Sequence, residues 1–256
     1  MSDFVGSGGP LTSAGLGASC DRLGVSLPQL WAVLKVETSG FGFLRDRRPQ
    51  ILFERHVFHH LTNGRFDVTA PDVSDPVPGG YGAGGAHQYD RLAQAITLDR
   101  MAALQSASWG IGQVMGRNAQ MVGFADIETM VREMAGSEDA QLHGMVGYVK
   151  AAGIDTALQH KDWAVFARAY NGKNYAERGY HTKLADACTH FELNGTPDLS
   201  IRTAQVFLTY RGFEPGPVDG IVGNRTKDAL VRFQHARGLP ENGSPDPVTL
   251  AALAAL

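Results

Sequence analysis

The stretch SLPQLWAVLKVETSG, residues 26–40, predicts a helix that ends on a carboxylate. Ser26 is a favourable N-cap residue, Pro28 is tolerated in a first helical turn, and Gly40 ends the pattern. The helix is therefore expected to run to Glu37.

The side chain of Glu37 is expected on the apolar face of this helix. Leu30, Val33, Leu34 and Glu37 stand at i, i+3, i+4 and i+7, positions that share one side of a helix. Burial raises the pKa of a carboxyl group and keeps it partly protonated, as a general acid acting on a glycosidic bond requires. The alternative is a structural carboxylate bound to a buried arginine or to backbone donors.

Composition limits the classes of function. The chain of 256 residues can hold one large domain or two unequal ones, and its hydrophobic content of 43% is ample for a packed core. A net charge of −3 and a pI near 6.3 argue against nucleic-acid binding through a broad basic surface. No stretch approaches the ~20 apolar residues of a membrane helix, so membrane insertion is not expected.

The N-terminus and the cysteines point to a cytoplasmic site of synthesis. Residues 1–19 contain no Lys or Arg and no unbroken apolar core, so they lack the parts of a secretory signal. Cys20 and Cys188 lie far apart without metal-ligand spacing, and both are expected to be free buried thiols.

The chain is expected to divide near ELNGTPDL, residues 192–199, which concentrates turn-forming residues between two helical patterns. The expected division is a first domain over 1–192, a linker over 193–199 and a second domain over 200–256. Residues 71–86, rich in Pro and Gly, predict a loop.

The first domain is expected to be mainly α, with one small β element near 50–53, and the second to be a module of three short helices. Apart from the helix that ends at Glu37, helical patterns cover 92–104, 127–134, 141–151, 163–169, 181–187, 201–210, 226–236 and 247–256.

Three separated pieces of the first domain resemble one superfamily in both content and order. VETSG at 36–40, SWGIGQVMG at 108–116 and AYNG at 169–172 look like the catalytic-glutamate, Gly-x-x-Gln and Ala-Tyr-Asn motifs of goose-type lysozymes and lytic transglycosylases. That superfamily has a lysozyme-like α fold.

Further stretches narrow the resemblance. With ILFERHVF at 51–58, PGGYG at 78–82 and WAVFARAYNG at 163–172, the chain resembles the N-acetylmuramidase family of modular phage endolysins over nearly all of 12–190. The resemblance implies cleavage of the bond between N-acetylmuramic acid and N-acetylglucosamine, with Glu37 at the position of the family's catalytic acid.

Glu54 is the candidate for a second catalytic carboxylate, because it lies in a short apolar run that would border the same cleft. It would activate water. The separation of two carboxyl groups distinguishes inverting from retaining hydrolysis, and the sequence leaves this open. The alternative for Glu54 is a salt bridge to Arg55, Arg47 or Arg48.

Four polar or aromatic residues are candidates for substrate binding. Gln113 and Asn171 carry donor and acceptor groups suited to the acetamido and hydroxyl groups of an amino sugar, and Tyr170 offers a flat apolar face. Ser108 is expected either to contact substrate or to cap the segment that follows. Internal roles for Asn171, in a turn, and for Tyr170, in the core, remain open.

A metal centre is considered and set aside. His56 and His60 stand at i and i+4, as zinc ligands do, but the glutamate precedes the pair and no third ligand is marked. No metal and no cofactor are expected.

The second domain resembles the three-helix peptidoglycan-binding domain through PGPVDGIVGNRTKDALVRFQHARGLPENG, residues 215–243. Asp219 and Gly220 are expected to form a turn, Thr226 to cap a helix, and Leu230 with Phe233 to point inward. The residues considered for contact with the cell wall are Tyr210, Arg211, Asp219, Arg225 and Gln234.

These features predict a monomeric modular endolysin whose partner is bacterial peptidoglycan. Synthesis is expected in the host cytoplasm, with action on the wall in the periplasm after release through a holin-type pore or lysis. The alternatives are a lytic transglycosylase that forms anhydro products and a non-catalytic wall-binding protein. Removal of 197–256 is expected to weaken binding to sacculi more than turnover of soluble fragments.

Overall fold

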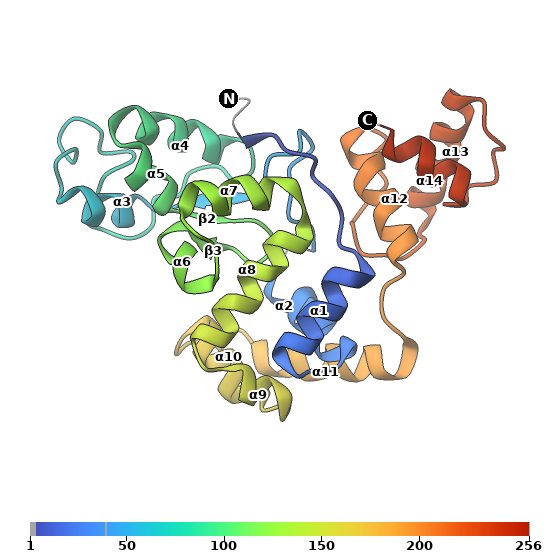
Figure 1. Ribbon diagram of the computed structural model, residues 1–256, viewed down its shortest axis with the longest axis horizontal. Coiled ribbons are helices and arrows are strands. Elements are labelled where there is room, and N and C mark those ends of the chain that lie inside the picture. Colours follow the sequence, from blue (N-terminus) through green and yellow to red (C-terminus); the bar gives the residue numbers. More distant parts are fainter. Residues whose placement is uncertain (1–3, 39, 256) are drawn as a thin grey trace.

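The computed structural model describes residues 4–38 and 40–255, and it confirms a mainly α fold with a small sheet (Figure 1). The larger, N-terminal part contains α1 Ser13–Leu23, α2 Leu27–Glu37, α3 Arg55–Thr62, α4 His87–Leu98, α5 Arg100–Gln105, α6 Ala119–Val122, α7 Ile127–Gly136, α8 Glu138–Ala151, α9 Asp155–Gln159, α10 Trp163–Asn171 and α11 Tyr180–Asn194. A short 3₁₀ helix, η2, spans Gly116–Asn118.

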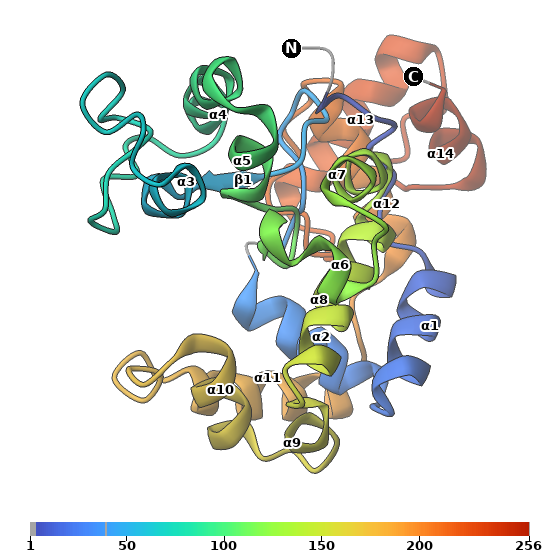
Figure 2. The same ribbon diagram turned by 60° about the vertical axis from the view of Figure 1, so that its left-hand side comes forward.

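The sheet has three short antiparallel strands in the order β1-β2-β3. They are β1 Ile51–Phe53, β2 Ala107–Trp109 and β3 Val114–Met115. Figure 2 shows the C-terminal end of α2 between β1 and α3 on one side and α10 on the other.

Helix α2 begins and ends as its sequence predicts. Ser26 and Gln29 form a reciprocal capping box at its start. At its end, the hydroxyl of Thr38 donates to the carbonyl of Leu34 and accepts from the amide of Gly40. Both ends of the helix are therefore fixed by local hydrogen bonds, and Glu37 lies in its last turn.

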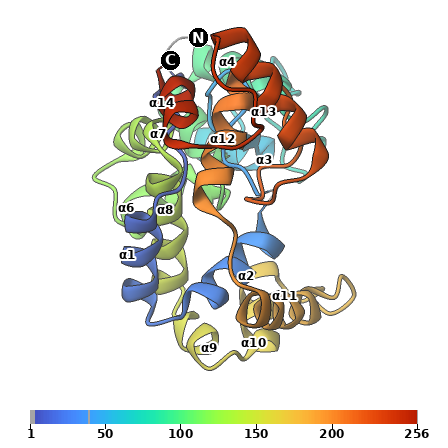
Figure 3. The ribbon, with the colours of Figure 1, turned by 90° about the vertical axis from the view of Figure 1, so that its right-hand side faces the viewer.

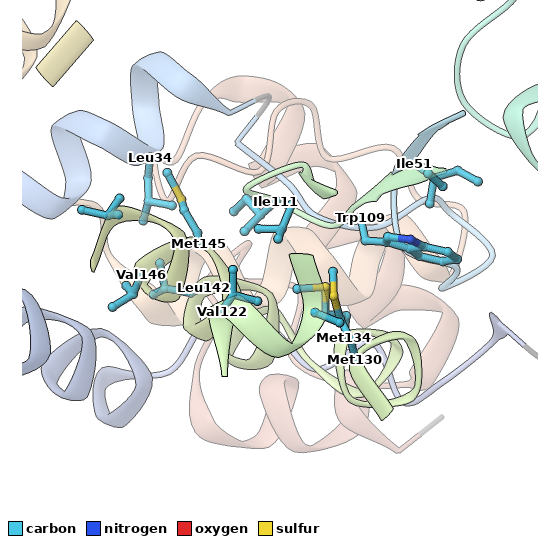
Figure 4. Packing of buried hydrophobic residues seen from close by; sticks show 14 of the residues in the cluster. Leu34, Ile51, Trp109, Ile111, Val122, Met130, Met134, Leu142, Met145 and Val146 are labelled. Carbon is cyan, nitrogen blue, oxygen red and sulfur yellow. The ribbon is translucent and has the colours of Figure 1, made fainter. Parts of the chain in front are cut away.

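The main hydrophobic core surrounds α2. Leu30, Val33 and Leu34 are each 2% exposed, which confirms the predicted apolar face. Helix α11 packs along α2, as Figure 3 shows. Figure 4 shows Leu34 of α2, Trp109 of β2 and Met145 of α8 in this core.

The pattern over 92–104, predicted as one helix, is divided between α4 and α5. Asp99 separates them, because its side chain accepts from the amide of Ala102 and caps α5. Helices α1, α3, α6 and α9 and strands β2 and β3 were not predicted from the sequence. Helices α3, α6 and α9 and both strands are short, so their periodicity is weak. Helix α1 is as long as α2, but Leu16 and Leu23 are its only large apolar residues.

The C-terminal module is built from α12 Leu199–Tyr210, α13 Asn224–Arg237 and α14 Pro247–Ala254, drawn in orange and red in Figure 1. Leu230 and Phe233 lie in its separate core, as predicted. The predicted cap at Thr226 is wrong: Gly223 is the N-cap of α13, and Thr226 is buried with its hydroxyl donating to Pro215 O. Leu256, the end of the last predicted helix, lies outside the described residues.

Residues 195–198 connect α11 to α12, within the predicted linker. Both cysteines are unpaired; Cys188 is buried, whereas Cys20 is half-buried. No helix among the described residues has both the length and the apolar character needed to cross a membrane.

Candidate active site

Glu37 lines a cavity of about 330 Å³ in the N-terminal part. Its carboxylate is half-buried at the C-terminal end of α2. The polar and aromatic residues that share this cavity include Gln113, Arg117, Asn118, Tyr148, Tyr170 and Asn171. The structure thus brings Glu37 together with three of the four predicted substrate-binding residues.

Asn171 is the direct partner of Glu37. Its Nδ2 donates a hydrogen bond of 2.8 Å to Glu37 Oε1. Burial raises the pKa of Glu37, and the hydrogen bond from Asn171 lowers it by a smaller amount, so the pKa lies above its ordinary value. The site therefore favours a carboxylic acid that keeps its proton closer to neutral pH than a free glutamate does.

Tyr170 forms one aromatic wall of the cavity. Its ring stacks on Phe166 with centroids 5.5 Å apart, and Tyr148 packs edge-on against it at 5.8 Å. Burial raises the pKa of Tyr170, and the nearby negative charge of Glu37 raises it further. The phenol is consequently neutral, and its ring is fixed from two sides.

Gln113 stands on a tight loop between β2 and β3. Its backbone has a positive φ of 47°, and that of Gly110 has a φ of 70°. The side-chain amide of Gln113 donates to the carbonyl of Gly110 at 2.8 Å, which holds the exposed side chain at the cavity. The side-chain Oε1 of Gln141, on α8, accepts from the backbone amide of Ile111 within the same loop.

Ser108 lies in the middle of β2 and is 5% exposed, so it neither caps a helix nor lines the cavity. Its hydroxyl donates to Gln113 Oε1 at 2.8 Å. The geometry therefore indicates that Ser108 orients Gln113. Trp109, the next residue, is completely buried, in agreement with the expected core role.

Glu54 does not line the cavity that contains Glu37. It precedes α3, and its largely buried carboxylate lies 3.2 Å from His56 Nδ1 and 3.4 Å from the hydroxyl of Tyr81. Its Oε2 atom has no hydrogen-bond partner among the described residues. Its role as a base that activates water stays a prediction.

Two of the three arginines considered as structural partners of Glu54 pair with other carboxylates. Arg48 pairs with Asp46 at 2.7 Å, and Arg55 pairs with Asp75 at 3.3 Å. Within the described part of the chain, no salt bridge joins Glu54 to an arginine. The carboxylate of Glu54 is therefore not committed to stabilising the loop through a guanidinium.

The histidines near Glu54 are separately engaged. His59 binds Asp67 at 2.8 Å, while His56 faces Glu54. Within residues 4–38 and 40–255, no three His, Cys, Asp or Glu side chains are grouped so that they would hold a metal ion.

Sequence reasoning missed Tyr148, Arg117 and Asn118, which also line the cavity. Tyr148 lies on α8 among Met145, Val146 and Val149, so the helix pattern reads as core. Arg117 and Asn118 follow the glycine-rich motif directly, in the short helix η2. Their position directly after the motif that contains Gln113 is the feature of the sequence that could have identified them as cavity residues.

Most of the polar residues considered for wall contact in the C-terminal module have internal roles. Gln234 is completely buried and binds the loop around Ser244. Tyr210 donates to the carbonyl of Gly8, in the N-terminal part. Arg211 caps the end of α14, and Asp219 holds its own turn.

Comparison with known proteins agrees with this arrangement. The N-acetylmuramidase family matches residues 26–192, and the putative peptidoglycan binding domain matches residues 198–253. The crystal structure of the Burkholderia AP3 phage endolysin is similar, with a TM-score of 0.68 and 40% sequence identity over 72% of this chain and 71% of that one. A search of curated proteins gives no match.

Proposed function

We propose, from the premise that this chain belongs to the N-acetylmuramidase family, that Glu37 is the general acid that cleaves the glycan strand of peptidoglycan. The chain is a glycoside hydrolase with a peptidoglycan-binding module, organised as a modular endolysin. The observation that carries the assignment of Glu37 is its half-buried carboxylate, with a raised pKa, inside a cavity of polar and aromatic side chains.

In this mechanism, protonated Glu37 donates its proton to the oxygen between N-acetylmuramic acid and N-acetylglucosamine. The leaving sugar departs, and Glu37 becomes a carboxylate. Asn171 continues to donate its N–H to Oε1 and favours the charged form that proton transfer creates. The same residue thus limits how far burial raises the pKa of the acid.

Gln113 and Tyr170 are proposed to bind the sugar rings. Tyr170 presents a ring fixed by stacking, and Gln113 presents an amide fixed by Ser108 and Gly110. The NH2 group of the Gln113 amide donates to both Gly110 O at 2.8 Å and Gln50 O at 3.3 Å, and its Oε1 accepts from Ser108. These bonds orient the amide and leave a second lone pair on Oε1 for a donor group of the substrate.

We propose that Glu54 activates the water molecule that attacks the sugar. The buried Oε2 of Glu54 lies 3.2 Å from His56 Nδ1 but makes no hydrogen bond in the described part of the chain, and Tyr81 donates to Oε1 at 3.4 Å, which holds the carboxylate in place. In the alternative reaction of a lytic transglycosylase, the 6-hydroxyl of the substrate attacks in place of water. In a Glu54→Ala variant, added azide should restore turnover if the lost step is attack by water.

A basic extension of the site supports an acidic, peptide-bearing glycan as substrate. Asn171 and Tyr180 also line a neighbouring cavity of about 290 Å³, together with Lys173 and Arg178. Among the described residues, no carboxylate lines this cavity, so the positive charges of Lys173 and Arg178 fit the carboxylates of a stem peptide. A Lys173→Met/Arg178→Met variant should show a higher KM on glycan with stem peptides and an unchanged KM on peptide-free glycan.

Mass spectrometry of digested peptidoglycan tests the reaction itself. Hydrolysis at the proposed bond leaves reducing N-acetylmuramic acid ends. Anhydro ends would identify a lytic transglycosylase, and an absence of products would identify a non-catalytic wall-binding protein. Products that end in reducing N-acetylglucosamine would contradict the proposed bond specificity.

The cellular setting proposed here is synthesis in the host cytoplasm, followed by passage through a holin-type pore or by lysis. The enzyme is proposed to act as a monomer, without nucleic acid and without insertion into the membrane. The phage origin of the structurally similar endolysin supports this setting.

A further inference from the structure

A buried ion pair joins the C-terminal module to the N-terminal part. Arg202, on α12, donates to both carboxylate oxygens of Glu138, on α8, at 2.5 and 2.8 Å. The side chains are 1% and 0% exposed. Since such a pair is screened from water, each charge depends on the other for compensation.

The carboxylate of Glu138 also binds two backbone segments. Its Oε1 accepts from the amide of Gly42 at 3.0 Å, and its Oε2 accepts from the amide of Leu11 at 3.0 Å. Including the two bonds from Arg202, the carboxylate accepts four hydrogen bonds from three separate stretches of chain.

Arg202 has a further bond that reaches the segment after the proposed acid. Its Nη2 donates to the carbonyl of Gly40 at 2.8 Å, three residues beyond Glu37. Arg202 therefore holds the carbonyl of Gly40, while Glu138 holds the amide of Gly42. The backbone that leaves α2 is bound from both sides by one ion pair.

Close packing around Gly42 leaves this segment little freedom. A Cβ atom at Gly42 would lie 1.8 Å from Gln141 Oε1, the same oxygen that accepts from Ile111 in the Gln113 loop. Glu138 and Gln141 are three residues apart on α8, so they lie on one side of that helix. One face of α8 thus positions both the Glu37 segment and the Gln113 loop.

The contact between the two parts extends beyond the ion pair. Tyr210, at the end of α12, donates to Gly8 O at 2.8 Å, and its ring packs against Phe41 and Phe43. Figure 3 shows α12 as the helix of the module that faces the N-terminal part.

We propose that Arg202 is a positioning residue for Glu37, so that the peptidoglycan-binding module completes the catalytic domain in addition to holding the wall. This inference rests on the proposed role of Glu37. It assigns the module a task in turnover of soluble substrate, where attachment to the wall plays no part.

The test uses full-length variants and a soluble glycan substrate. Arg202→Met leaves Glu138 buried and unpaired, and the melting temperature should fall by roughly 6–20 °C. At a temperature where every variant is folded, kcat should fall by roughly 10–100-fold with KM nearly unchanged, because the acid is misplaced while the sugar-binding groups remain.

A double variant separates positioning from stability. Arg202→Met/Glu138→Gln removes both charges, so it should recover much of the lost melting temperature. Its kcat should stay low, because neither the bond to Gly40 nor the charged acceptor for Gly42 returns. A double variant with restored melting temperature and wild-type kcat would overturn the proposal.

Arg45→Met is the matched control. Arg45 lies in the same contact region, where it faces Glu214 at 4.0 Å with both side chains largely exposed, so both melting temperature and kcat should be close to wild type. Glu37→Gln, measured in parallel, distinguishes the two failures. An active Glu37→Gln contradicts the proposed function, whereas an inactive one beside a fully active Arg202→Met contradicts only the role of Arg202.

Discussion

Asn171 donates its side-chain N–H to Glu37 Oε1 at 2.8 Å, across 134 positions of the sequence. The bond connects the last residue of α10 to the last residue of α2. It places the amide and the proposed acid in one cavity, and it ties the protonation of Glu37 to the position of α10.

Replacement of Glu37 by Gln should lower the clearing of murein suspensions by roughly 10²–10⁴-fold, the usual contribution of a general acid. Pelleting with sacculi should be unchanged, because the C-terminal module is intact. Glu177→Gln, at an exposed residue that does not line the cavity, is the control and should retain full clearing. Undiminished clearing by Glu37→Gln would refute the assignment.

The same variant should be more stable than wild type at alkaline pH. The pKa of Glu37 is raised in the folded protein, so the folded state binds the proton more tightly than the unfolded state does. The stability from this group is present below the unfolded pKa of about 4.3 and is lost as pH rises through the folded pKa. Glu37→Gln should therefore melt higher than wild type at pH 8, and this gain should vanish near pH 3.5.

Replacement of Asn171 by Ala should shift the pH profile of kcat. The hydrogen bond from Asn171 lowers the pKa of Glu37, so its removal raises that pKa further. The alkaline limb of kcat, where the acid loses its proton, should move to higher pH. A limb at unchanged or lower pH would show that Asn171 does not control the acid.

Replacement of Ser108 by Ala should act on substrate binding through Gln113. Loss of one neutral hydrogen bond of about 0.5–1.5 kcal/mol should raise KM by roughly 2–10-fold while kcat stays unchanged. Steady-state kinetics on soluble glycan fragments checks this. A fall in kcat without a change in KM would place Ser108 in the chemical step instead.

Removal of 197–256 should lower turnover of soluble fragments as well as retention on sacculi. This expectation extends the one drawn from the sequence, because the shortened chain loses Arg202, the counter-charge of Glu138 and the donor to Gly40 O. The loss of stability from the broken ion pair should be at most about 3–5 kcal/mol, because removal of the module also opens Glu138 to water, and denaturant unfolding measures it. A shortened chain with wild-type stability and turnover would show that the module only attaches the enzyme to the wall.

The predictable parts of this fold depend on local signals. Ser26, Gln29 and the apolar spacing of α2 are encoded within one helix, so both its limits and its buried face could be predicted. The order of the three motifs identified Glu37, Gln113 and Asn171, which the structure brings to one cavity. The short strand β1 was predicted from its apolar run, whereas β2 and β3 flank a glycine-containing loop and show no recognisable alternation.

The sequence by itself determined the helical class of the fold and three residues of the Glu37 cavity, Gln113, Tyr170 and Asn171, because caps, periodicity and motifs are properties of neighbouring residues. Only the tertiary structure decided that Ser108 supports Gln113 from within a strand and that Glu54 faces His56. Only the packing of the C-terminal module against the N-terminal part decided that Arg202 is buried against Glu138, 64 positions away. An arginine on an amphipathic helix reads as a surface residue until a separate part of the chain supplies its counter-charge.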